Sequence, residues 1–577
     1  MRHRRPIANN NFSSERGAWK KNWKGRLPVG LVFPNSYGVG MSNLGLQLVY
    51  ELVNQHPDLV CERIFLPDKD GVPLSVESSR PLVDFPVILC SVSFEQDIPS
   101  LVRMLLMAGL APLGEDRLDE EIRSGMPLII GGGVCCFINP ETVAPFVDML
   151  VIGEAEPVLP VILERLLGQE QFGRRRELLR GMATELPGCY VPQFYHFHYG
   201  SDLILNKIEV EPGIPARVRR LGIEAPPIVA AHSSVLSPAT EFSDLYMVEL
   251  GRGCSKGCRF CAAGFVYRPP RLWSGSAILA AVAERPDGVE RIGLLGMEMV
   301  RSAELQEVAE RLLMDGCQLS FSSLRADVIG NSLLDLLAKS GLKTVAIAPD
   351  GGSERLRRVI NKGISRGDVL LGAEKLVKAG IVNLKLYFMI GLPTETEDDL
   401  DELVALVGEV REIMNVPGRA RGRLSTLTLS INPFVPKAWT PFQYYPFNEV
   451  TLLKKKFKYL RRGLSKVSNL KIMGEKPDNA FMQAILAKGD RRLAPAIIDY
   501  AKRGGNWPQI LRKRGLQPEH YATRARDREE LFPWEVIDHG IKRDYLWAEY
   551  QRALAGRATG PCETAKCRRC GVCLYEK

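Results

Sequence analysis

Long apolar runs and a secretory leader are both missing from this sequence of 577 residues. Nowhere do about 18 apolar residues follow one another, so we expect no membrane-spanning helix. The start of the chain is basic but lacks the apolar stretch of a signal peptide, and we expect residues 1–26 to form a solvated basic arm. These absences favour a cytoplasmic protein that does not contact the membrane.

Histidine is scarce, with 7 residues, whereas cysteine is plentiful, with 13. An odd number of cysteines in a long chain without a targeting segment excludes a secreted disulfide framework. Two knots of cysteines, at 254–261 and 562–573, are typical of metal ligands in a reducing compartment. Four scattered cysteines are interpreted as small buried apolar residues, namely Cys61, Cys90, Cys189 and Cys317.

Short apolar runs alternate with helical patterns from residue 27 onward, which predicts an α/β fold. Residues 27–170, with runs such as MPLIIGGG and VDMLVIGE, predict a Rossmann-like, doubly wound domain of parallel strands. Residues 171–240 are less regular, and we expect a connector with one strand pair around FYHFHY and LILNKIEVE.

A second strand–helix series occupies residues 241–450. Its six apolar runs, from DLYMVEL to LSTLTLSIN, predict a partial (β/α)6 barrel whose strand C-termini carry the chemistry. Residues 451–577 are predicted to form a mainly helical C-terminal region with a cysteine-rich tail. The basic run LLKKKFKYLRRGLSK is interpreted as a solvated helix face or, alternatively, as a surface that contacts RNA.

The first knot lies in GRGCSKGCRFCAAGF, directly after the first predicted barrel strand. Structural zinc normally takes four protein ligands, yet no fourth cysteine lies within fifty residues of Cys254, Cys258 and Cys261. Three thiolates suit a 4Fe–4S cluster with one iron left open to a substrate. We expect Phe260 to shield one flank of the cluster from water, and the neighbouring basic residues Lys256 and Arg259 to offset its negative charge.

At this loop the chain resembles the radical S-adenosylmethionine (radical SAM) enzymes, whose hallmark is a CxxxCxxC loop after the first barrel strand. The resemblance implies a 4Fe–4S cluster, S-adenosylmethionine bound at its open iron, and reductive cleavage of the S–C5′ bond. The 5′-deoxyadenosyl radical would then abstract a hydrogen atom from an unidentified substrate. It also implies a small electron donor such as flavodoxin or ferredoxin.

Further strand ends of the second series are similar to the S-adenosylmethionine cradle of that superfamily. Gly296 lies where the superfamily keeps a Gly-Gly-Glu-like segment, although the segment here reads Gly296-Met297-Glu298. SSLRAD would approach the ribose and carboxylate, APDGGSERL would bind a hydroxyl, and FMIGLPTET would pack against adenine. The residues that the resemblance assigns to these roles are, in order, Ser323 and Arg325, Asp350 or Ser353, and Ile390 with Gly391.

The N-terminal domain resembles the cobalamin-binding-like domain that precedes the barrel in one large class of radical SAM enzymes. The resemblance is carried by FPNSYGVGMSNLG and by IIGGGVCCFINPETVAPFVDMLVIGEAEPVLP, whose glycines would let a flat ligand lie across the sheet edge. The DxHxxG loop that supplies an axial histidine is absent, so cobalamin would bind without a protein imidazole below the cobalt. Alternatively, the domain is a degenerate scaffold that shapes the substrate entrance.

The closing stretch PCETAKCRRCGVC supplies four cysteines in a CxxxxCxxCxxC pattern: Cys562, Cys567, Cys570 and Cys573. Four ligands so close together would complete a zinc site or hold a second iron–sulfur cluster, and the tight spacing is closer to that of ferredoxins than to paired zinc knuckles. A second cluster would relay an electron or anchor substrate, whereas zinc would have only a structural role in the tail.

Three functions remain open on these patterns. The first is a radical SAM enzyme acting on an unidentified substrate, and the second is a cobalamin-dependent radical SAM methyltransferase. The third is a non-catalytic iron–sulfur or zinc protein that binds partners or carries electrons, which leaves the glycine-bearing strand ends of the barrel unexplained. Nearly the full length of the chain resembles one family of radical SAM proteins with this domain order and a cysteine-rich tail.

Overall fold

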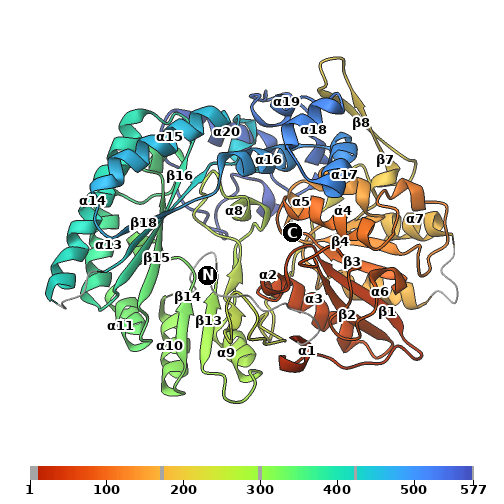
Figure 1. Ribbon diagram of the computed structural model, residues 1–577, viewed down its shortest axis with the longest axis horizontal. Coiled ribbons are helices and arrows are strands. Elements are labelled where there is room, and N and C mark those ends of the chain that lie inside the picture. Colours follow the sequence, from red (N-terminus) through yellow and green to blue (C-terminus); the bar gives the residue numbers. More distant parts are fainter. Residues whose placement is uncertain (1–10, 169–173, 297–301, 421–424, 575–577) are drawn as a thin grey trace.

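The computed structural model describes residues 11–168, 174–296, 302–420 and 425–574. Two α/β parts lie side by side, with the N-terminal part on the right of Figure 1 and the second strand–helix series on the left. The C-terminal helices run across the top of both parts. No helix in the described ranges combines the length and apolar character needed to cross a bilayer.

The N-terminal part is built on a six-stranded sheet in the order β2-β1-β3-β4-β5-β6. Its first five strands are parallel, and β6 pairs antiparallel with β5. The order 2-1-3-4-5 is that of flavodoxin-like doubly wound sheets, which confirms the predicted fold class. The strands are β1 (Leu27–Phe33), β2 (Leu59–Phe65), β3 (Val87–Ser91), β4 (Leu128–Gly132), β5 (Met149–Val151) and β6 (Cys189–Tyr190).

The strands of this sheet are almost entirely buried, because helices cover both faces and parallel strands then read as continuous apolar runs. The sheet also runs past residue 170, since β6 follows the helix α7 (Arg175–Glu185). The covering helices before it are α2 (Tyr37–Gly40), α3 (Leu44–Gln55), α4 (Asp97–Met107), α5 (Val134–Ile138) and α6 (Leu159–Leu167).

The second part is an open, curved arrangement of parallel strands, which agrees with the predicted partial barrel. A single parallel bridge between Leu324 and Ile347 joins its three-stranded and four-stranded sheets. All six predicted strands form, and β18 adds a seventh. The strands are β10 (Tyr246–Glu249), β13 (Arg291–Leu295), β14 (Gln318–Phe321), β15 (Thr344–Asp350), β16 (Asn383–Ile390), β17 (Leu427–Pro433) and β18 (Leu470–Met473).

Helices cover the outer face of this sheet, so alternate strand residues are fully buried against them. The other residues of β16 and β17 are only half-buried and face the inside of the curve. The helices are α9 (Gly275–Ala283), α10 (Ser302–Met314), α11 (Asn331–Lys339), α12 (Glu354–Val359), α13 (Arg366–Lys378) and α14 (Glu397–Ala420).

The connector holds the expected strand pair, β7 (Tyr195–Tyr199) with β8 (Leu205–Val210). The C-terminal region packs on both α/β parts, because α17 contacts α4 of the first and α20 contacts α12 of the second. This region therefore fixes how the two parts face each other. Its helices are α15 (Val450–Gly463), α16 (Pro477–Lys488), α17 (Ala494–Arg503), α18 (Trp507–Lys513), α19 (Pro518–Ala522) and α20 (Arg543–Leu554).

Candidate functional site

The three-cysteine loop begins where β10 ends, so it lies at the C-terminal mouth of the curved sheet. A short ladder between β11 (Gly251–Arg252) and β12 (Arg271–Leu272) closes its base, and α8 (Ala263–Val266) follows the last cysteine. A Cβ atom at Gly253, where φ is +85°, would come within 2.8 Å of the carbonyl oxygen of Tyr267. Only glycine allows this close approach of the backbone.

The three cysteines are half-buried and lie beside a set of charged groups. The Lys362 ammonium lies 2.5 Å from a carboxylate oxygen of Asp350, and Arg325 donates to the Lys362 carbonyl at 2.8 Å. Burial raises the pKa of Cys258 to about 12, while the positive charges of Lys362 and Arg325 act in the opposite direction. These cations would stabilise bound thiolates and the negative cluster that they hold.

Two residues of the predicted cradle, Arg325 and Asp350, therefore lie beside the three cysteines. Lys362 was not among the predicted residues, although it closes the stretch SERLRRVINK that begins with the predicted Ser353. Lysine at the end of a helical run reads as an exposed charge, and only the fold shows that Lys362 is 9% exposed. The sequence carries one indication of this role, because Lys362 follows Asp350, the last residue of β15, by twelve positions.

The other predicted cradle residues lie in surroundings that differ from those of Arg325 and Asp350. Gly296 directly follows β13, and its carbonyl oxygen accepts a hydrogen bond from the hydroxyl of Ser322 at 3.0 Å, whereas Ser323 is exposed. Met297 and Glu298 of the same segment lie outside the described residues. The hydroxyl group of Ser322 is thus the one that faces the end of the second barrel strand.

Ser353 is completely buried and serves the fold. Its hydroxyl accepts from the backbone N–H of Leu356 at 3.0 Å, which caps α12, and donates to Asp399. Ile390 is also completely buried at the end of β16. Gly391 has φ of +80°, and a Cβ there would come within 3.0 Å of Leu453, so close packing accounts for this glycine.

The residues between the loop cysteines tie the loop to the rest of the chain. Phe260 packs against the small apolar cluster that includes Leu392 and Phe434. Arg259 was expected to offset the charge of the cluster, but its guanidinium is completely buried and pairs with Glu549 at 3.1 Å. That expectation needs correction, because the charge of Arg259 is already matched inside the interface with α20.

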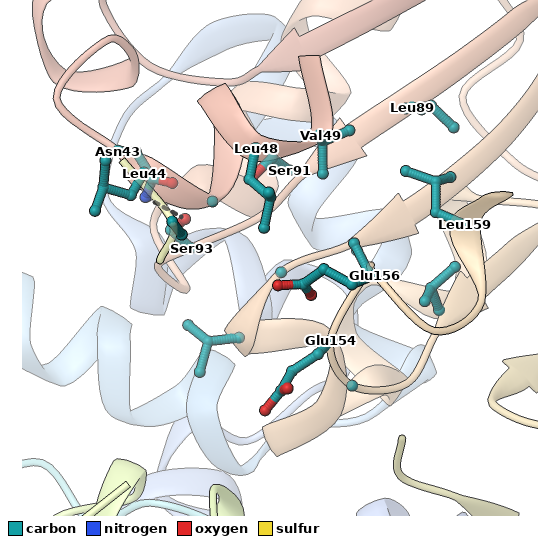
Figure 2. Close-up of a pocket in the computed structure, with 18 of the residues that line it drawn as sticks. Asn43, Leu44, Leu48, Val49, Leu89, Ser91, Ser93, Glu154, Glu156 and Leu159 are labelled. Atoms are coloured by element: carbon teal, nitrogen blue, oxygen red, sulfur yellow. Dashed lines mark hydrogen bonds between the residues drawn. The ribbon is translucent and has the colours of Figure 1, made fainter. Parts of the chain in front are cut away.

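A cavity of about 390 Å³ lies between the two α/β parts (Figure 2). The strand ends of the N-terminal sheet contribute Ser91, Gly132 and Glu154, and the barrel contributes Glu249 and Leu295 at the ends of β10 and β13. Doubly wound sheets bind ligands where the strand order reverses, here between β1 and β3. The cavity thus combines that edge with the barrel strands next to the cysteine loop.

The two sides of this cavity differ in chemistry. Figure 2 shows Leu48 and Val49 of α3 on one side and the carboxylates of Glu154 and Glu156 on the other. Asn43 donates to the hydroxyl of Ser93 at 3.2 Å near the cavity rim. No histidine is found among the described residues that line the cavity. The absence agrees with the missing axial-histidine loop in the sequence.

Arg252 connects the cavity to the cysteine loop. Two positions before Cys254, it forms ion pairs with Glu156 at 2.7 Å, Glu249 at 3.0 Å and Glu154 at 3.1 Å. Burial acts to raise the pKa of Glu154, but Arg271 and Arg252 outweigh it and hold that pKa below its usual value. Carboxylates from both α/β parts are thereby joined through one guanidinium.

The second cysteine knot also reaches the loop. The backbone N–H of Cys562 donates to the carbonyl oxygen of Ser255 at 2.7 Å, and a small hollow is lined by residues of both segments. The structure therefore brings together the two knots that are about three hundred positions apart in the chain.

Residues 45–192 match the family described as radical SAM proteins, N-terminal, and residues 248–407 match the radical SAM superfamily. An uncharacterized protein of Methanocaldococcus jannaschii is 26% identical over 507 residues, which cover 87% of this chain and 97% of that protein.

Two similar solved structures have TM-scores below 0.5. The methyltransferase TsrM of Kitasatospora setae, solved with cobalamin and a [4Fe–4S] cluster, has a TM-score of 0.46 and 13% identity, covering 73% of this chain and 74% of that one. OxsB, solved with aqua-cobalamin and S-adenosylmethionine, has a TM-score of 0.45 and 13% identity, covering 92% and 80%.

The donor set of the loop fits a 4Fe–4S cluster, since three thiols and no further cysteine of that loop face a buried lysine and arginine. Because both family matches span the domains that carry this loop and the adjoining cavity, the chain belongs to the radical SAM superfamily and is an enzyme that uses a 4Fe–4S cluster and S-adenosylmethionine.

Proposed function

We propose that this enzyme abstracts hydrogen from a substrate held in the cavity between its two α/β parts. The observation that carries the proposal is the position of Arg252, which contributes to the cavity wall and lies two positions before the first cluster cysteine. A substrate in the cavity would therefore lie next to the cofactor site. When bound, the cluster supplies the electron that breaks the S–C5′ bond of S-adenosylmethionine.

The protein's own residues would bind and orient the cofactors. Cys254, Cys258 and Cys261 would hold the cluster, with Lys362 and Arg325 compensating its charge. Asp350 would hold the Lys362 ammonium in place through their ion pair. The N-terminal sheet covers the mouth of the barrel on the cavity side, and this cover supports exclusion of water from a reactive intermediate.

Formation of 5′-deoxyadenosine tests this function. The reconstituted protein is incubated anaerobically with S-adenosylmethionine and dithionite, and product is measured by chromatography. We expect product from the wild type and none from Cys254→Ala, while Cys317→Ala, at a buried cysteine outside both knots, behaves like the wild type. Equal traces from all three proteins would instead show that the cleavage does not depend on the three-cysteine loop.

Whether the cavity holds the substrate is tested separately. Glu156→Gln keeps the size of a side chain that reaches the cavity, but removes its charge. Glu154 and Glu249 remain as partners of Arg252, so we expect this change to alter turnover with substrate and to leave the slow, substrate-free cleavage of S-adenosylmethionine within about twofold. A loss of substrate-free cleavage would show instead that Glu156 acts on the cysteine loop through its ion pair with Arg252. The electron donor in the cell would be a small carrier of the flavodoxin or ferredoxin class.

Cobalamin-dependent methyl transfer is the second candidate function. It is favoured by the flavodoxin-like strand order and by Gly132, where a Cβ atom would meet no other atom within 4 Å, so the sheet edge is open. A cavity of about 390 Å³ lies at the small end of the range for small-molecule sites and encloses only part of a ligand as large as cobalamin. Binding would thus require the two parts to separate.

Anaerobic purification in the presence of cobalamin decides between the two candidates. Cobalamin that remains on the protein and gives its absorbance spectrum after gel filtration would support methyl transfer. A protein that cleaves S-adenosylmethionine without retaining cobalamin would support the scaffold role of the N-terminal domain.

A further inference from the structure

The four-cysteine tail is held on the backbone of the catalytic loop by a dense set of hydrogen bonds. The Cys562 N–H donates to the Ser255 carbonyl at 2.7 Å. The side-chain amide of Asn361 bridges the two segments. Its N–H groups donate to the carbonyls of Gly257 at 3.2 Å and Thr559 at 3.1 Å, and its oxygen accepts from the Thr559 N–H at 2.8 Å. Because these bonds link main-chain atoms, they fix the tail relative to the cluster ligands themselves.

The four thiols of the tail lie in one neighbourhood. Cys562 is close enough to Cys567, Cys570 and Cys573 for their charges to interact. Cys570 is 4% exposed, and a hollow beside it is lined by three of the four thiols together with Ser255 of the catalytic loop. Four thiols gathered in one neighbourhood have the ligand number and chemistry that a metal site needs.

One guanidinium donates to a sulfur of this set and a second lies beside it. Arg569 donates from Nε to the Sγ of Cys567 at 3.3 Å. Arg268, which is 4% exposed, lines the same hollow as Cys570 and donates to the Gly264 carbonyl at 2.9 Å. N–H donors of this kind stabilise thiolate-bound centres and tune their reduction potential. Arg268 thus connects the outer thiols with the end of the catalytic loop.

We propose that Cys562, Cys567, Cys570 and Cys573 bind a second 4Fe–4S cluster, which passes the reducing electron to the catalytic cluster. The inference rests on the proposed function, because it assigns an electron path to the same loop. The path runs from Cys562 through one hydrogen bond to Ser255, the residue next to Cys254. The CxxCxxC spacing of the last three cysteines is that of ferredoxin-type ligation.

The electron balance needs one external reductant. A small acidic one-electron carrier, of the ferredoxin or flavodoxin class, is oxidised by one electron as the outer cluster is reduced, and the outer cluster is reoxidised as it reduces the inner one. No proton moves and no bond breaks in this relay. Lys566 and Arg568 are exposed beside Cys567, and their positive charges suit docking of an acidic carrier.

Metal analysis of the anaerobically reconstituted full chain tests the site. We expect about eight irons and about eight sulfides per chain for the wild type, and about four of each for the double variant Cys567→Ala/Cys570→Ala. The double variant Cys189→Ala/Cys317→Ala, at two buried cysteines outside both knots, should keep about eight. Four irons and one zinc per wild-type chain would overturn the proposal.

Reduction kinetics test the relay and separate its failure from that of the proposed function. Lys566→Glu/Arg568→Glu should slow reduction of the catalytic cluster by reduced ferredoxin about tenfold or more at low salt, while the rate with dithionite stays unchanged. If the cysteine double variant does not fold, this charge-reversal variant still tests the relay. If ferredoxin reduced the variant as fast as it reduces the wild type, and dithionite did so too, the relay would be overturned. Dithionite-driven cleavage of S-adenosylmethionine would still report on the proposed function.

Discussion

The Lys362 ammonium lies 2.5 Å from the Asp350 carboxylate, at a site where both side chains are largely buried beside the cluster cysteines. The charge of Lys362 acts to lower the pKa of Cys258, which burial raises, and would compensate bound thiolates, and Asp350 fixes the position of the ammonium. A buried pair of this kind is costly to break, because the remaining partner keeps an unmatched charge away from water.

Replacement of Lys362 by methionine should weaken both folding and cluster binding. We expect the free energy of unfolding to fall by about 3 kcal/mol, and iron retention during gel filtration to fall clearly below that of the wild type. Urea unfolding and iron analysis measure the two effects. Lys378→Met removes an exposed lysine that pairs with Glu374 at 2.6 Å, and should change stability by less than about 0.5 kcal/mol. If the two variants behaved alike, Lys362 would have no special role.

Arg252 should prove essential for the contact between the cavity and the cysteine loop. Arg252→Gln leaves the carboxylates of Glu154, Glu156 and Glu249 without their shared partner, so we expect a loss of about 3 kcal/mol or more in stability. Formation of 5′-deoxyadenosine should fall as well, because the loop loses its anchor.

The matched control for this prediction is Arg103→Gln, which removes an exposed ion pair with Asp70 at 2.5 Å. Its stability should stay within about 0.5 kcal/mol of the wild type. Unaltered stability and cleavage in Arg252→Gln would mean that the loop is positioned without the cavity.

The stability of the protein should depend on acid through Glu154, whose pKa is held below its usual value by Arg271 and Arg252 against the effect of burial. A carboxyl group with a lowered folded-state pKa stabilises the fold above its unfolded-state pKa, about 4.3, and loses that contribution as the pH falls through the folded-state pKa. The free energy of unfolding of the wild type should thus exceed that of Glu154→Gln at pH 7. This difference should shrink below about pH 4.

Glu51 provides the opposite case, because burial, together with the charge of Glu284, raises its pKa despite the nearby His232. Its ionisation opposes folding, so Glu51→Gln should be neutral or stabilising at pH 7. The advantage of Glu51→Gln over the wild type should vanish toward acid pH. Parallel urea titrations at several pH values compare the two variants, and equal trends for both would refute the assignment.

Two adjacent glycines at the sheet edge should respond differently to substitution. At Gly133 φ is +96° and a Cβ would lie 2.5 Å from the Val92 carbonyl oxygen, so Gly133→Ala should cost about 1–3 kcal/mol in stability. At Gly132 no atom lies within 4 Å of a Cβ, so Gly132→Leu should fill the cavity with little effect on folding.

Thermal unfolding and turnover with substrate, or cobalamin uptake if it occurs, distinguish the two effects. Gly132→Leu should lose ligand binding while keeping its melting temperature. A lower melting temperature for Gly132→Leu, with unchanged turnover, would place the ligand elsewhere.

Sequence patterns predicted most strands of the N-terminal sheet because these strands are buried on both faces and therefore read as apolar runs. They missed β2, whose sequence LVCERIF carries two charges in its middle. Glu62 accepts from the indole of Trp23 at 2.7 Å, and Arg63 pairs with Glu15 at 2.6 Å. Such partners are distant in sequence, so a strand with buried charges looks like an exposed segment.

The three-cysteine loop could be recognised because its spacing is local, and the ligand role of Cys254, Cys258 and Cys261 stays a prediction. The surroundings of the loop could not be predicted. The expected role of Arg259 was wrong because its partner, Glu549, lies 290 positions away. The same holds for Lys362, whose partners Asp350 and Arg325 lie 12 and 37 positions before it. Spacing identifies ligands, but charge compensation depends on the tertiary fold.

The hydrogen bonds of Arg259 have a consequence for the order in which the molecule matures. One of its partners, Thr559, is 300 positions further along the chain, so a ribosome-bound intermediate exposes the cysteine loop long before that partner is synthesised. Iron and sulfide inserted at that stage would enter a loop without its final scaffold. We therefore expect the loop to hold its cluster firmly only after the C-terminal residues have been synthesised and have packed against it.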